Sequence, residues 1–344
     1  MGQSIRAPRL QVLINGLPLA GTIDAEVITS SRFHAGSFRI SAVLTQPDFS
    51  FNFWTTSNEI AVTVLAATNQ TGELDTVIEG KADQISVDPV RGLVRIFGRD
   101  YTSVLLDSNS QDVFVNKTAS EIAISIATRR GLVPLVSPTT GMIGRQDNDG
   151  YTYSTFRQFS RTLSDWDILV DLAVREGCDV FVTGKSLHFQ PSGLMRRQVN
   201  LSVATAKSVR VERLLPGESD IGVIVQSWDC RQQAMVQEMA GGSQSQDAGF
   251  QQPTASRTYI VMEPNLSAAE AARIAKSRLT EFSSYKTTCI IDMPGDLALT
   301  ARDEIQLGDQ GGLPIGNFQI ESIDRRFHPV SGFTQRVRTR ASAG

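Results

Sequence analysis

The chain has 344 residues, of which 41% are hydrophobic and 20% charged, and its formal net charge is −3 at pH 7. This composition is that of an ordinary globular protein, and the length suits two or three domains. With a negative net charge we expect no sequence-specific binding to nucleic acid, because phosphates attract basic proteins.

Cysteine usage and hydropathy indicate where the protein works. Cys178, Cys230 and Cys289 are odd in number and lie far apart, which predicts reduced, buried thiols of a cytosolic protein. No apolar run approaches the length of a transmembrane helix, and the opening MGQSIRAPRL lacks the apolar core of a signal peptide. We therefore expect no membrane insertion by this chain.

Residues 1–105 are predicted to form a first β-barrel domain. Short runs of alternating apolar and polar residues, separated by turn residues, begin near residue 8, and this pattern is typical of antiparallel strands. The segment RLQVLINGLPL contains Asn15 and Gly16, a strong signal for a two-residue hairpin turn. The spacing of the runs indicates a small barrel or sandwich.

Residues 106–200 are predicted to form a small inserted module of two helices and a hairpin. The first helix lies in NKTASEIAISIATRRG, where an apolar stripe recurs at helical spacing. Thr118 and Glu121 form a capping box at its start, and Gly131 ends it.

The second helix and the hairpin lie within residues 164–191. Ser164 is the predicted N-cap, and Asp167 is the acidic residue whose side chain would bond back to the N-cap residue. Gly177 is predicted to end the helix. The alternating runs CDVFV and SLHF then predict two strands that turn at Gly184. Every polar residue of this stretch thus has a structural role.

Residues 201–344 are predicted to form a second β-barrel with one helix, which a capping box of Ser267 and Glu270 begins. Residues 238–256 are rich in Gly, Gln and Ser and low in apolar content, so they are predicted to be a mobile loop. The predicted fold class is therefore α+β, mainly β.

A weak internal repeat relates the first and last thirds of the chain. GKADQISVDPVRGLVRIFGRD begins at Gly80, and GNFQIESIDRRFHPVSGFTQRVRTR begins at Gly316. Each segment has a strand, a Ser-Val-Asp or Ser-Ile-Asp step, a turn with glycine, and a second strand. One pair of segments does not prove duplication, but it predicts two versions of one β-unit.

No group of residues has the pattern of a catalytic, cofactor or metal site. The three histidines have no partner at metal-ligand spacing, and the sequence has neither a nucleophile elbow nor a phosphate-binding glycine loop. Conceivable zinc ligands are Asp167, Asp171, Cys178 and His188. Zinc sites normally show tighter ligand pairs, so we expect no metal, no cofactor and no enzyme activity.

Two features are candidates for an interface with another protein. Arg336, Arg338 and Arg340 alternate along a predicted strand and share one face, which meets either an acidic partner or water. Trp166, in the second helix of the inserted module, either packs within the chain or anchors a neighbour. The sequence leaves these alternatives open.

The order of these elements resembles the baseplate hub proteins of phage tails, the late-control-D and Mu-like hub family, which is related in fold to the T4 hub. The resemblance extends from about residue 8 to 340 and is carried chiefly by GRDYTSVLLDS and NKTASEIAISIA. It implies two tail-tube-like β-barrel domains with an inserted small α+β module.

The resemblance also implies a function, that of a structural hub. A homotrimer would surround a DNA channel and join the tail tube or distal tail proteins on one side to a central spike protein on the other. The protein would lie in the virion tail after assembly in the host cytoplasm. The loop 238–256 has no counterpart in the resemblance.

Two other functions stay open at the level of sequence. NKTASEIAISIATRRGLVPLV also resembles the start of a LysM module, which would make residues 106–200 a peptidoglycan-binding unit of a tail protein. A muralytic tail enzyme is the second alternative, because two carboxylates can meet from distant positions in a chain.

Overall fold

The computed structural model describes residues 8–44, 48–67, 73–109, 114–143, 145–148, 151–154, 163–194, 196–214, 221–229, 233–241, 257–264, 266–309, 311 and 313–342. Strands predominate in these residues, which confirms the predicted α+β, mainly β fold class. Within the same residues, no helix is long and apolar enough to cross a membrane.

The N-terminal part folds into strands that bury one face. They are β1 (Arg9–Ile14), β2 (Leu17–Leu19), β3 (Thr22–Ser30), β4 (Ser37–Val43), β5 (Ala61–Ala67), β6 (Asp75–Asp88) and β7 (Leu93–Asp100), with helix α1 (Phe51–Thr56) between β4 and β5. The predicted first hairpin is confirmed, because Asn15 and Gly16 have positive φ and join β1 to β2. Alternation puts Val27, Ile40 and Ile96 into the core.

The middle part contains the predicted helices and hairpin. Its elements are α2 (Ser103–Leu106), β8 (Lys117–Thr118), α3 (Ala119–Arg129), β9 (Val133–Val136), β10 (Met142–Ile143), β11 (Arg145–Asn148), β12 (Tyr151–Ser154), α4 (Asp165–Glu176), β13 (Cys178–Thr183) and β14 (Ser186–Pro191). Both predicted capping boxes are present, and Gly177 ends α4 with φ 66°. Strand β9 adds parallel to β14, a pairing with no local sequence signal.

The C-terminal part mixes strands and one long helix. Its elements are β15 (Gln198–Ser202), the 3-10 turn Val203–Thr205, β16 (Ser208–Arg213), β17 (Ile221–Asp229), β18 (Ala234–Ala240), β19 (Arg257–Met262), α5 (Ala268–Ser284), β20 (Thr287–Pro294), β21 (Glu304–Gly308), β22 (Pro314–His328) and β23 (Gly332–Ala341). The capping box of Ser267 and Glu270 is confirmed at the start of α5.

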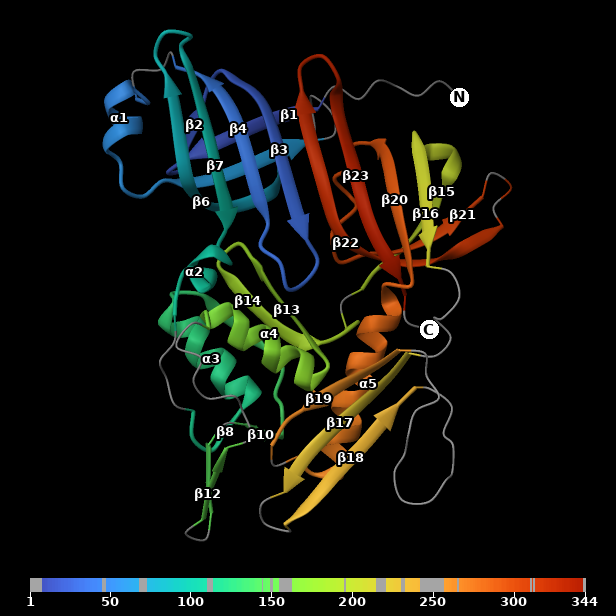
Figure 1. Ribbon diagram of the computed structural model, residues 1–344. Coiled ribbons are helices and arrows are strands. Elements are labelled where there is room, and N and C mark those ends of the chain that lie inside the picture. Colours follow the sequence, from blue (N-terminus) through green and yellow to red (C-terminus); the bar gives the residue numbers. More distant parts are fainter. Residues whose placement is uncertain are drawn as a thin grey trace.

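The first and last parts of the chain share one sheet. Its strand order is β16-β20-β23-β22-β3-β4-β7-β6-β5-β1-β2, and off this path β21 pairs with β22 and β15 pairs with β21. The two parts join where β22 pairs antiparallel with β3, from Ala25 opposite Phe327 to Ser30 opposite Ser322. In Figure 1 this sheet and α1 occupy one end of the molecule, and α2, α3, α4 and α5 lie toward the other.

Strands β17, β18 and β19 do not belong to the large sheet. They form a separate three-stranded sheet in the order β18-β17-β19, and α5 covers one face of it. Val223, Val225 and Val261 belong to the same apolar cluster as Ile274 of α5. The C-terminal part of the described chain therefore has two separate cores, and the domain boundaries at residues 105 and 200 stay predictions.

The predicted mobile loop begins later than expected. Residues 238–240 belong to β18, because Glu238 pairs with Val225 and Ala240 packs against the α5 core. Apolar residues at alternate positions favour the strand over the loop there. The rest of the prediction, residues 242–256, lies outside the described residues, as does Cys230.

The internal repeat corresponds to two long hairpins. Segment Gly80 onward forms the end of β6 and β7, and segment Gly316 onward forms β22 and β23. Both hairpins are antiparallel, and each contains one register shift, near Ala82 and near Ile320. The similarity in sequence is thus accompanied by a similarity in local structure.

Candidate functional site

The two described cysteines are buried and unsuited to nucleophilic chemistry. Burial raises the pKa of the Cys178 thiol to about 12 and that of Cys289 to about 11. A reactive cysteine needs a lowered pKa, since the thiolate is the nucleophile. These two side chains therefore serve as small apolar residues of the core.

The conceivable zinc ligands do not assemble. Asp167 caps α4 through Ser164, and Asp171 faces Arg175 on the same helix. His188 stacks on Phe181 with ring centroids 4.5 Å apart, and burial lowers its pKa. Among the residues that the structure describes, no three acidic, histidine or cysteine side chains form a group that could hold a metal ion.

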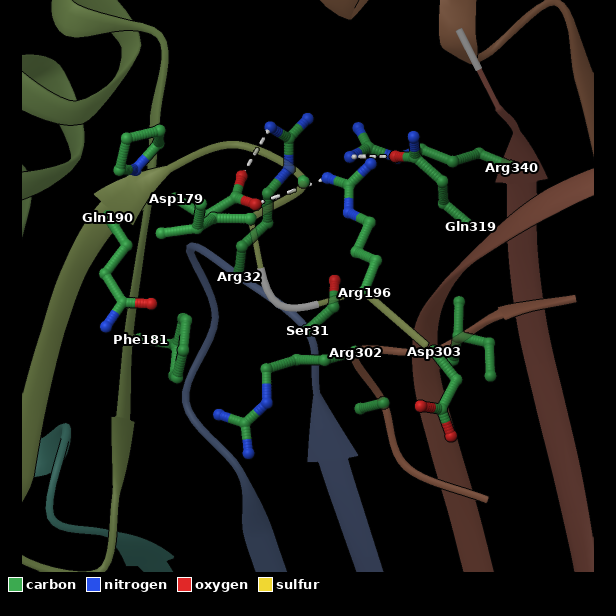
Figure 2. A pocket seen from close by; sticks show the side chains of 15 residues that line it. Ser31, Arg32, Asp179, Phe181, Gln190, Arg196, Arg302, Asp303, Gln319 and Arg340 are labelled. Atoms are coloured by element: carbon green, nitrogen blue, oxygen red, sulfur yellow. Dashed lines mark hydrogen bonds and ion pairs between the residues drawn. The ribbon is translucent and has the colours of Figure 1, made fainter. Parts of the chain in front are cut away.

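A group of arginines lies where the middle part of the chain meets the large sheet (Figure 2). We call it the junction cluster, and it consists of Arg32, Asp179, Arg196, Arg302 and Arg340. The Asp179 carboxylate accepts from Arg32 at 3.1 Å and from Arg196 at 3.2 Å. The loop after β3 and the segment after β14 are thereby tied to β13.

The other two arginines of the junction cluster are largely desolvated. Arg302 lies 4.3 Å above the Phe181 ring and donates to Thr183 at 2.8 Å. Arg340 donates to Gln319 and to Ser284, both at 3.2 Å. Burial lowers the pKa of both guanidinium groups, and the positive charge of Arg32 adds to this effect at Arg340.

The space within the junction cluster is too small for an organic ligand. Its cavity measures ≈ 30 Å³, far below the roughly 300–1,000 Å³ of typical ligand pockets. A larger open groove of ≈ 410 Å³ lies beside it. There Asp100 accepts from the backbone of Gly36 and Thr102, and Arg325 donates to Thr29 and to the Leu299 carbonyl. Asp100 and Arg325, two of the charged residues that line the groove, thus hold neighbouring chain segments in place.

Trp166 anchors the helical module within the chain itself. Its side chain is 3% exposed, and its indole N–H donates to the Phe33 carbonyl at 3.2 Å. The Phe33 amide in turn donates to the Val180 carbonyl. Of the two roles that the sequence left open, packing within the chain is the one that the structure shows.

The three C-terminal arginines lie on one face of β23 but in different environments. Arg336 forms a bidentate ion pair with Asp292, at 2.6 and 3.3 Å. Arg338 is exposed, whereas Arg340 is 2% exposed beneath the end of α5. Arg336 and Arg338 therefore stay candidates for contact with a partner, and Arg340 belongs to the junction cluster.

The β18-β17-β19 sheet has an outer face, away from α5, on which the described strand residues have no charged side chains. Because side chains alternate along a strand, this face carries the residues that point away from α5. They are Ile224, Gln226, Trp228, Met235, Gln237, Met239, Thr258, Ile260 and Met262. Trp228, Met235 and Ile260 are each more than half exposed. We call this surface the uncharged sheet face.

The sequence analysis did not predict the uncharged sheet face, although the sequence of β17 contains one indication of it. The sequence IGVIVQSW of β17 has no charged residue before Asp229, so neither face of this strand carries a charge there. Which face of this sheet α5 covers depends on long-range packing, and the sequence of each strand does not indicate it. Large contiguous apolar patches on a protein surface mark sites of interaction with other molecules.

Several solved structures resemble the whole chain. A tail protein from Neisseria meningitidis MC58 has a TM-score of 0.71 and 13% identity, with 97% of this chain and 96% of that chain covered. The 43 kDa tail protein of prophage MuSo2 from Shewanella oneidensis has a TM-score of 0.67 and 16% identity, with 97% and 98% covered.

A third is the E. coli c3393 protein, described as a type VI secretion component structurally similar to the T4 tail proteins gp27 and gp5. Its TM-score is 0.57 and its identity 12%, with 95% of this chain and 76% of that chain covered. In sequence, by contrast, no family model and no curated protein matches the chain. The chain has the fold of phage tail proteins, as the resemblance in its sequence implied.

Proposed function

We propose that the protein is a structural baseplate hub of a phage or phage-like tail. The observation that carries the proposal is the similarity to tail proteins over 97% of the chain. A likeness of this extent involves the large sheet, the helical module and the α5 layer together. It therefore concerns the whole architecture and not one common motif.

The hub would be a homotrimer that fits both the six-fold symmetry of the tail tube and the three-fold symmetry of the spike. Two similar hairpins lie in one sheet of each chain, so three chains contribute six similar units to a ring. Such a ring meets a six-fold tube on one side and a three-fold spike on the other without breaking closed symmetry. The two similar β-units support this arrangement.

Charge and surface chemistry support the same proposal. A net charge of −3 suits the wall of a channel that lets DNA pass, because a basic wall would retain the phosphates. The uncharged sheet face suits a protein that works inside an assembly, where such a face is covered. We propose no catalytic role, since the described cysteines, His188 and His328 are placed as structural residues.

The proposal is tested by locating the chain in purified particles. An antibody against this chain, with gold-labelled secondary antibody, is expected to label the end of the tail in electron micrographs. Label elsewhere, or absence of the chain from purified tails, would contradict the proposal. A pull-down on purified cell wall separates the peptidoglycan-binding alternative, which requires saturable binding that is lost when residues 106–200 are deleted.

A further inference from the structure

The two similar hairpins end in turns that share proline, valine and glycine at matching positions. Residues 88–93 read DPVRGL between β6 and β7, and residues 328–333 read HPVSGF between β22 and β23. Each turn thus has a polar residue, then Pro and Val, then a residue that differs between the turns, and then Gly. We call these two turns the hairpin tips.

The hairpin tips also share their hydrogen bonds and backbone conformation. Asp88 accepts from the amides of Val90 and Arg91 at 3.1 and 3.0 Å. His328 accepts through Nδ1 from the amides of Val330 and Ser331 at 3.1 and 3.4 Å. The glycines that follow have φ 64° and 71°, a region that favours glycine.

The turn itself explains every shared residue except valine. Proline sets the φ of a turn, the polar side chain caps the free amides, and glycine adopts the left-handed conformation. Val90 is 94% exposed and Val330 is 89% exposed, the two highest values among large hydrophobic side chains in the described chain. A β-branched apolar residue gains nothing from such a position within its own chain.

Both hairpin tips lie at the same end of the large sheet. Strand β22 is antiparallel to β3, β3 to β4 and β4 to β7, so β23 and β7 run in the same direction. The turns that precede these two strands therefore point the same way, as Figure 1 shows. Four strand spacings separate β23 from β7, about 19 Å along the sheet.

We infer that the hairpin tips dock into two copies of one small apolar site, on neighbouring subunits of a ring of identical protein subunits. Two equal tips that face one end require two equal sites at a fixed spacing, and a symmetric homo-oligomer presents them. A second copy of this chain does not fit this requirement, because neighbouring copies in a ring contact each other through two different surfaces. The inference rests on the proposed function in one respect, that the ring is the end of the tail tube.

The experiment places a photo-cross-linking amino acid at Val90, at Val330 or, as control, at Leu313, which is 69% exposed and lies outside both tips. Each full-length variant is assembled into tails, irradiated and digested, and the cross-linked peptides are identified by mass spectrometry. We expect Val90 and Val330 to cross-link to the same peptide of the same protein, and Leu313 not to reach that peptide.

Three results would overturn the inference. They are cross-links from the two tips to different peptides, cross-links to another copy of this chain, and yields no higher than at Leu313. Each of these is read from tails that contain the chain. Absence of the chain from the tails instead contradicts the proposed function, so the two failures are distinguishable.

Discussion

At the scale of single residues, the junction cluster shows how the helical module is held against the sheet. Asp179 is 15% exposed and faces two arginines that are 17% and 21% exposed. Ser192 adds a third hydrogen bond, at 2.9 Å. A carboxylate so placed satisfies partly buried cations from two separate segments, and its loss leaves both cations without that partner.

We expect Asp179→Ala to lower the free energy of unfolding by about 2 kcal/mol, because two partly buried arginines lose their acceptor. The matched control is Asp292→Ala, which removes the acceptor of the more exposed Arg336 and is expected to cost less than about 1 kcal/mol. Urea unfolding of both variants measures the difference. Equal losses would show that the junction cluster has no special role in stability.

The position and burial of Arg340 show what the sequence can predict about a residue and what it cannot. Alternation correctly places Arg340 on the same face of β23 as Arg338. Its burial follows from Ser284 and Tyr285 at the end of α5, which lie more than fifty residues away in the chain. Nothing near Arg340 in the sequence carries that information.

At the scale of elements, local signals were predictive and long-range pairings were not. Capping residues and hairpin turns act within a few residues, so the starts of α3, α4 and α5 and the β1–β2 turn were predicted and are confirmed. The pairing of β3 with β22 joins residues about 300 positions apart. A strand's own pattern shows which face is buried and does not show its neighbour.

We expect Ile260→Lys to leave folding intact and to disrupt assembly. Ile260 is 56% exposed on β19, an edge strand of the uncharged sheet face, so a charge there changes the free energy of unfolding by no more than about 0.5 kcal/mol. A partner that covers the face would have to bury that charge. The readout is the amount of this chain in purified tails, compared with the unmodified protein.

The control for this variant is Val211→Lys on β16, which is 44% exposed outside the uncharged sheet face. It is expected to enter tails as well as the unmodified chain does. Normal incorporation of Ile260→Lys, together with normal tail yield, would show that the uncharged sheet face stays in solvent in the assembled particle.

At the scale of the whole molecule, one sheet spans the first and last parts of the chain and presents two equal hairpin tips at one end. The helical module and the α5 layer lie toward the other end (Figure 1). This division suits a connector whose two ends meet different partners. Resemblance in the sequence indicated the tail-protein fold, whereas the separate α5 layer emerged only from the structure.

The central claim is that three chains form the hub, and the solution mass tests it most directly. Light scattering at rising protein concentration, alone and with the spike protein added, measures how many copies associate. The claim predicts three times the chain mass of 37.5 kDa, at the latest when the spike protein is present, because partner binding stabilises the assembled state. A monomer or dimer that persists in both conditions would contradict it.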